Sequence, residues 1–156
     1  MFGITTAKDF RSKASRDNAA LQSDIANADY AINAVLSAYH LHEWVWGRSL
    51  KASSPISVRG TMLREKKDWV AWLDANFPHF SLLQDLANGS KHCVPVSAES
   101  VDGYGEGPWG IGPFGVPYLL IDLGSEKQVE DRWRVASDVL QDANDFWAEL
   151  GAEFNF

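Results

Sequence analysis

The chain has 156 residues, of which 46% are hydrophobic and 22% are charged, and this composition excludes wholesale disorder and a fibrous repeat. The length fits one domain, so we predict a single domain over residues 1–156. A formal net charge of −7 repels polyphosphates, so the charge does not favour RNA as a partner.

Cysteine usage and hydropathy give an expectation about location. Cys93 is the single cysteine, so an internal disulfide is excluded. No charged segment followed by an apolar signal core stands near the N-terminus. Charged residues interrupt every long apolar stretch before it reaches the roughly 20 residues that a membrane-spanning helix needs. The sequence therefore predicts a cytoplasmic chain with no membrane partner.

Residues 10–46 carry apolar or small side chains that recur in steps of three and four, which is the period of one helix face. This pattern predicts one long helix, with a break near residues 15–18 as the alternative. Thr6 is the expected N-cap, because Asp9 three positions later can complete a capping box. Gly47 is the expected end of the helix.

Two more helices are expected after a loop over residues 48–60, a segment that lacks periodicity and contains Ser, Pro and Gly. The second helix is expected to begin near Thr61. Pro78 is expected to end it and to start a third helix that runs from about His79 to about Lys91. The basic residues around the loop are expected to form a solvated surface: Arg48, Lys51, Arg59, Arg64, Lys66 and Lys67.

The last third of the chain mixes strand and helix signals. Residues 93–101 alternate apolar and polar side chains, and residues 116–124 form a short apolar run, so these two segments are expected to pair as a hairpin. A closing helix is expected after Ser125. The predicted fold class is therefore mainly α: a four-helix up-and-down bundle with an inserted β-hairpin and a Gly-rich loop before the last helix.

The Gly-rich loop contains two G-x-G-x-x-G strings, over residues 105–110 and 110–115. A dinucleotide site needs a strand before such a string and a helix after it, whereas here a strand is expected to follow and prolines remove backbone donors. We interpret the loop as consecutive turns whose rings, Tyr104, Trp109 and Phe114, pack on the body or on a partner. No cofactor is expected.

Three side chains on the first helix are candidate metal ligands: His40, His42 and Glu43. His40 and His42 point about 200° apart on a helix, so either His40 with Glu43 or His42 alone can face one site. A metal-binding bundle enzyme would combine these residues with Asp85 and His92. His42 also falls on the apolar face, where a hydrogen-bonded structural histidine is the alternative.

Asp85, Asn88 and His92 stand at positions i, i+3 and i+7, so a helix places them in one polar stripe. A carboxylate, an amide and an imidazole together often mark a cleft. In the alternative interpretation the segment is a helix C-terminus, capped by Asn88 or Gly89, where Lys91 and His92 complement the helix dipole.

The string formed by Leu83, Leu86, Asn88 and His92 resembles the Arg-Asn-x-x-x-His segment of the HEPN (higher eukaryotes and prokaryotes nucleotide-binding) superfamily. The resemblance implies a small helical bundle, a homodimer, and metal-independent ribonuclease chemistry in which the histidine transfers a proton and the arginine stabilises the scissile phosphate. Ala87 stands where the family has its arginine and can do neither, so only Asn88 and His92 carry over.

These observations predict a non-catalytic HEPN-like protein of a bacterium or its mobile elements, which acts through binding or assembly alongside a toxin, defence or regulatory system. Seven tryptophans and the aromatic loop favour a homodimer or a protein partner. One alternative is a metal-independent ribonuclease that uses His92 and Asn88, with Lys91 or Arg64 supplied across a dimer cleft. Asp85 is a further candidate catalytic residue. The other alternative is the metal-binding bundle enzyme.

Overall fold

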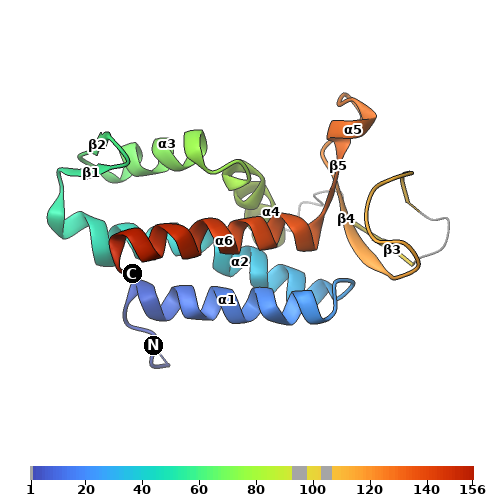
Figure 1. The fold of residues 1–156 in the computed structure, drawn as a ribbon, viewed down its shortest axis with the longest axis horizontal. Coiled ribbons are helices and arrows are strands. Elements are labelled where there is room, and N and C mark those ends of the chain that lie inside the picture. Colours follow the sequence, from blue (N-terminus) through green and yellow to red (C-terminus); the bar gives the residue numbers. More distant parts are fainter. Residues whose placement is uncertain (1, 93–97, 103–106) are drawn as a thin grey trace.

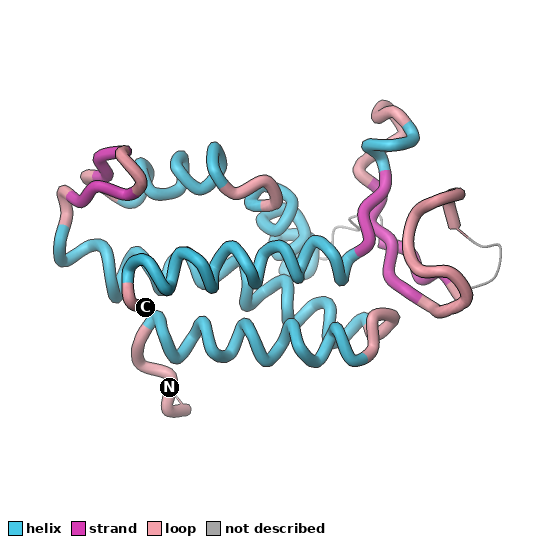
Figure 2. Tube along the Cα trace, viewed as in Figure 1, coloured by secondary structure: helices cyan, strands magenta, loops and turns pink. Residues whose placement is uncertain are grey.

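The computed structural model describes residues 2–92, 98–102 and 107–156. Within these residues the chain is mainly helical and has two small antiparallel sheets, which confirms the predicted mainly α class (Figures 1 and 2). The helices form an elongated body. Both chain termini lie at one end of its long axis, and the three-stranded sheet projects from the other end (Figure 1).

The bounds of the helices are α1 (Ala7–Ser23), α2 (Ala28–Val45), α3 (Lys66–Asn76), α4 (Phe80–His92), α5 (Val129–Arg132) and α6 (Ala136–Phe154). A π-helical turn, η1 (Trp46–Leu50), and a 3-10 turn, η2 (Lys51–Ser53), follow α2. The strands are β1 (Ile56–Val58), β2 (Thr61–Leu63), β3 (Ala98–Val101), β4 (Tyr118–Asp122) and β5 (Trp133–Val135). β1 pairs with β2, and β4 lies between β3 and β5.

α1 and α2 together replace the single long helix predicted over residues 10–46. The expected capping box at the start of α1 is confirmed, since the Thr6 hydroxyl accepts from the Asp9 N–H at 3.1 Å. The prediction of one helix is wrong because Asn27 starts a new one: its side chain accepts from the Tyr30 N–H at 3.2 Å. The break therefore lies at residues 24–27, not at residues 15–18.

The segment after α2 is more ordered than predicted. Gly47 does not end the helical path, because one further turn buries Trp46 and Leu50. The expected loop over residues 48–60 contains η2 and the strand β1. The second helix begins at Lys66 and not near Thr61, which lies in β2. Asp68 fixes this start, since its carboxylate accepts from the backbone N–H groups of the two residues before the helix.

α4 matches the predicted third helix closely. Phe77 has an extended backbone, with φ −116° and ψ 101°, as expected for the residue before a proline. The chain therefore turns at Pro78, and α4 starts two residues later. His79 is not freely solvated, because its Nε2 lies 3.1 Å from a carboxylate oxygen of Asp142 on α6.

The predicted hairpin is confirmed in its described part: β3 pairs antiparallel with β4, from Ala98 opposite Ile121 to Val101 opposite Tyr118. Residues 93–97 of the expected first strand lie outside the described residues. The closing helix begins later than predicted, because β5 pairs with β4 and takes up residues at helical spacing. Val135 of β5 is buried in a second, smaller apolar cluster under this sheet.

One aromatic core joins the helices. The rings of Trp69 and Trp72 on α3 stack at 5.5 Å. Trp147 on α6 meets Phe77 edge to face at 5.9 Å. Its indole N–H donates to the Ala38 carbonyl of α2 at 2.9 Å, which ties the two helices together. Within the described part of the chain, no helix combines the length and the apolar character needed to cross a membrane.

Candidate functional site

Two members of the polar stripe, Asp85 and Asn88, lie on the solvent side of α4. Asp85 and Asn88 are both exposed, whereas Leu83 and Ala87 face the core. The backbone stays helical through residue 92, so the periodicity argument for one stripe holds, and neither Asn88 nor Gly89 caps the helix. The side chains of Lys91 and His92 lie outside what the structure describes. The two described members of the stripe therefore face solvent, and the packed interior lies on the opposite side of the helix.

Ala87 occupies the position at which the resembled family carries its arginine. Its side chain is only 4% exposed and belongs to the main apolar core. A longer charged side chain at this position would begin inside the packed core, where burying a charge without a partner is costly. This position therefore has no arginine, and its packing in the core disfavours a charged side chain there.

The candidate metal ligands on α2 lie in different surroundings. His42 is 3% exposed, its Nδ1–H donates to the Tyr39 carbonyl at 2.5 Å, and its ring meets Phe80 edge to face. Burial lowers the pKa of His42. His42 is therefore the hydrogen-bonded structural histidine that the sequence offered as an alternative.

Glu43, the next residue, is exposed and accepts a hydrogen bond from Lys66 on α3 at 2.8 Å. This bond lowers the pKa of the Glu43 carboxyl. His40 is also exposed. Among the residues that the structure describes, no group of three or more His, Cys, Asp or Glu side chains is placed to hold a metal ion.

The basic stretch behaves as the predicted solvated surface. Its six members are exposed. Arg59 reaches across to α6 and bonds Glu149 at 2.7 Å and Glu153 at 2.9 Å. Lys67 pairs with Glu65 at 2.6 Å. Because carboxylates neutralise several of these cations locally, the stretch offers little attraction to a polyphosphate.

The Gly-rich loop before β4 has an unusual backbone conformation. Four of its glycines have positive φ, which side-chain-bearing residues rarely adopt: Gly107, Gly110, Gly112 and Gly115. This confirms the predicted turns in the described part of the loop. The strand β4 follows the loop, as expected, so the loop does not lead into a helix as a dinucleotide site requires. Tyr118 at the start of β4 is buried, and its hydroxyl donates to the Ile111 carbonyl at 2.8 Å.

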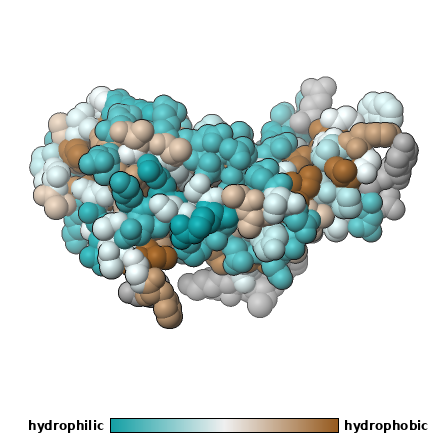
Figure 3. Space-filling model, turned by 60° about the horizontal axis from the view of Figure 1, so that its bottom comes forward, coloured by the Kyte–Doolittle hydropathy of each residue, from teal (hydrophilic) through white to brown (hydrophobic). Residues whose placement is uncertain are grey.

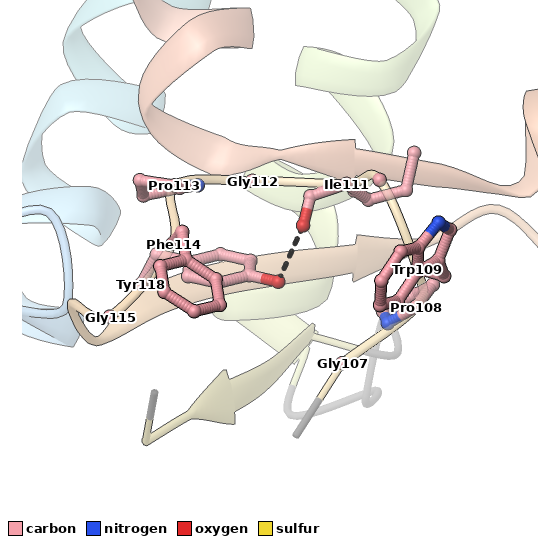
Figure 4. Close-up of a pocket in the computed structure, with 10 residues that line it drawn as sticks. Gly107, Pro108, Trp109, Ile111, Gly112, Pro113, Phe114, Gly115 and Tyr118 are labelled. Atoms are coloured by element: carbon pink, nitrogen blue, oxygen red, sulfur yellow. Dashed lines mark hydrogen bonds between the residues drawn. The ribbon is translucent and has the colours of Figure 1, made fainter. Parts of the chain in front are cut away.

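Sequence reasoning missed the part that Tyr118 plays. The signal was a single tyrosine at the head of an otherwise aliphatic run, because a buried tyrosine needs a partner for its hydroxyl. The ring of Tyr118 lies under the loop, and the hydrogen bond to Ile111 crosses the space that the loop encloses (Figure 4). One side chain thus holds the centre of the loop against the sheet.

An open pocket of about 350 Å³ lies against this loop, lined by residues 107–115 and Tyr118 (Figure 4). Trp109 is fully exposed, so its ring does not pack on the described part of the body, and packing on a partner remains the expected alternative for it. The physical reason is that Tyr118 already fills the space beneath the loop. Tyr104, the third expected ring, lies outside the described residues.

Gly112 and Gly110 give a matched test of this loop geometry. Both have φ close to +78°, so an alanine at either position costs about 1–2 kcal/mol of backbone strain. A Cβ at residue 112 would also lie 2.5 Å from the Tyr118 ring, whereas a Cβ at residue 110 meets nothing. We expect Gly112→Ala to lower the free energy of unfolding by about 1–3 kcal/mol more than Gly110→Ala in urea titrations. Equal losses would contradict the packing of Tyr118 under the loop.

Comparisons of this chain with protein-family models, with curated proteins and with solved structures found no match. The chemistry of both candidate surfaces, the polar face of α4 and the Gly-rich loop, therefore follows from their residues and geometry alone.

Proposed function

We propose that this chain is a non-catalytic HEPN-like binding and assembly protein, a cytoplasmic homodimer that serves a bacterial toxin, defence or regulatory system. The proposal includes a four-helix up-and-down bundle. Because the predicted first helix is two helices, the four members are now α1, α2, α4 and α6, and α3 is no longer one of them. Contacts of α1 with α2 and α6, and of α2 with α4 and α6, support this arrangement. In it, the Gly-rich loop and the small sheet form the insertion before the last helix.

The buried position of Ala87 is the main observation in support of a non-catalytic protein. Cleavage of RNA requires stabilisation of the charge that develops on the scissile phosphate. Ala87 has no group to supply it and faces the core. The nearby exposed Asp85 adds a negative charge to the same helix, and this disfavours a bound phosphate. What remains on α4 is a polar, solvent-facing surface suited to binding.

An RNA cleavage assay tests this proposal. Purified wild-type protein at high micromolar concentration is incubated with single-stranded and structured RNA, with and without a chelator. His92→Ala and His40→Ala, which removes an exposed histidine on another helix, serve as the matched pair. We expect no cleavage that depends on His92.

Two outcomes would contradict the proposal. Cleavage that is lost in His92→Ala, kept in His40→Ala and insensitive to chelator would support the metal-independent ribonuclease with Asn88 and His92. Cleavage that the chelator abolishes, together with stoichiometric metal in the purified protein, would support the metal-binding enzyme. The homodimer is tested separately by light scattering, and a strict monomer at high micromolar concentration would contradict it.

A further inference from the structure

An uncharged, largely apolar stretch of the chain, residues 107–121, lies at the sheet end of the molecule. The chain contains 21 acidic and 14 basic residues, yet residues 107–121 include none of them. Strongly apolar side chains show at this end and also near the opposite end, while much of the helical body between them is hydrophilic (Figure 3). Two molecules that each carry a net charge of −7 repel one another, so a surface without charge is the place where they can meet at least cost.

The same loop carries two features that complement each other. Trp109 is fully exposed, so no described part of its own chain covers the ring. The pocket is open and mostly apolar, and Trp109 forms part of its wall together with the Tyr118 ring and prolines (Figure 4). A volume of about 350 Å³ lies within the range of sites that enclose small organic groups. The pocket therefore fits an uncharged ring such as that of tryptophan.

We propose that the occupant is a second copy of this chain, and that Trp109 of each copy enters the aromatic pocket of the other. A two-fold axis makes such an exchange reciprocal, because the ring of one copy and the pocket of its partner form the same contact twice. The glycine turns and the Tyr118 hydrogen bond hold the pocket in shape before association. This inference rests on the proposed homodimer and specifies its interface.

The size of the surface can be compared with the area that a stable interface buries. One buried aromatic side chain removes roughly 150–250 Å² from water. Trp109, Phe114 and Val116, with the neighbouring prolines, therefore supply about 500 Å² per copy, less than the roughly 800 Å² per partner of a standard stable interface. We therefore expect a reversible dimer and not a permanent one.

Sedimentation velocity of the full chain over a concentration series tests the interface. Wild type is compared with Trp109→Ser and with Phe2→Ser, which removes another fully exposed ring far along the chain. We expect Trp109→Ser to weaken the dimer at least about tenfold, as for a central aromatic anchor, and Phe2→Ser to leave it unchanged. Added salt should strengthen the wild-type dimer, because it screens the repulsion between acidic bodies. Circular dichroism checks that each variant is folded.

The outcomes distinguish a failure of the loop interface from a failure of the proposed homodimer. A wild-type dimer that Trp109→Ser leaves intact would overturn the loop interface and leave the homodimer standing. A strict monomer at high micromolar concentration would overturn both. Equal weakening by Trp109→Ser and Phe2→Ser would also overturn the loop interface. A monomer that binds phosphatidylcholine vesicles through Trp109 would assign the loop to a lipid surface instead.

Discussion

Trp147→Ala is expected to lower the free energy of unfolding by about 3–5 kcal/mol, the usual cost of removing a large aromatic side chain from a core. The indole is 2% exposed and touches rings from two other segments, Phe77 at 5.9 Å and Trp69 at 6.3 Å. Its N–H bond to the Ala38 carbonyl is lost as well. Alanine would therefore leave a cavity where α2, α3 and α6 meet.

Urea unfolding followed by circular dichroism measures this loss without depending on tryptophan fluorescence. Phe2→Ala is the control, because it removes a large aromatic side chain from a fully exposed position outside the proposed dimer interface and is expected to change stability by less than about 0.5 kcal/mol. Trp147→Phe keeps a ring but loses the donor, so it should fall between the two. A Trp147→Ala loss below about 1 kcal/mol would contradict the core position assigned to this ring.

Periodicity in the sequence predicted which segments are helical better than it predicted where they turn. Ile25 and Ala28 continue the three-and-four spacing across the break between α1 and α2. The apolar pattern therefore does not show that the chain turns there. The usable signal was Asn27, a strong N-cap type. Trp133 likewise fits the spacing of the closing helix, but pairing of β5 with β4 opposite Asp122 holds it extended.

The candidate surfaces were predictable in composition and less so in orientation. Spacing correctly placed Asp85 and Asn88 on one face of α4, but only the burial of Leu83 and Ala87 shows that this face is the outer one. The glycines correctly predicted turns. Whether Trp109 packs on its own chain depends on which ring lies under the loop, a tertiary contact that local sequence does not encode.

Lowering the pH from 7 to about 5 is expected to destabilise the fold through His42. Burial lowers the pKa of this ring from 6.5, because the charged form loses its hydration in the core. In the unfolded chain the ring takes up a proton near its ordinary pKa, so the unfolded state binds more protons below that pH. The free energy of unfolding therefore decreases as the pH is lowered, by up to about 1.4 kcal/mol per pH unit for one proton.

The Asp122 carboxylate affects stability in a lower pH range than His42. The Arg132 guanidinium lowers the pKa of Asp122 from 3.8 to about 2, so the contribution of this pair is present at pH 5 and is lost only as the pH falls toward 2. A decline in stability between pH 7 and pH 5 is thus not caused by this pair. That separation makes the histidine effect measurable in the intact protein.

Urea titrations at several pH values, on wild type, His42→Gln and His40→Gln, isolate the buried ring. The pH slope is the readout, so a change in absolute stability on replacing His42 does not obscure the result. In His42→Gln we expect the pH slope of the unfolding free energy to decrease by an amount that corresponds to nearly one proton. In His40→Gln, which alters an exposed ring on the same helix, we expect the wild-type slope. The same slope in wild type and His42→Gln would mean that this histidine takes up its proton without unfolding, and that its surroundings are more open to water than its 3% exposure indicates.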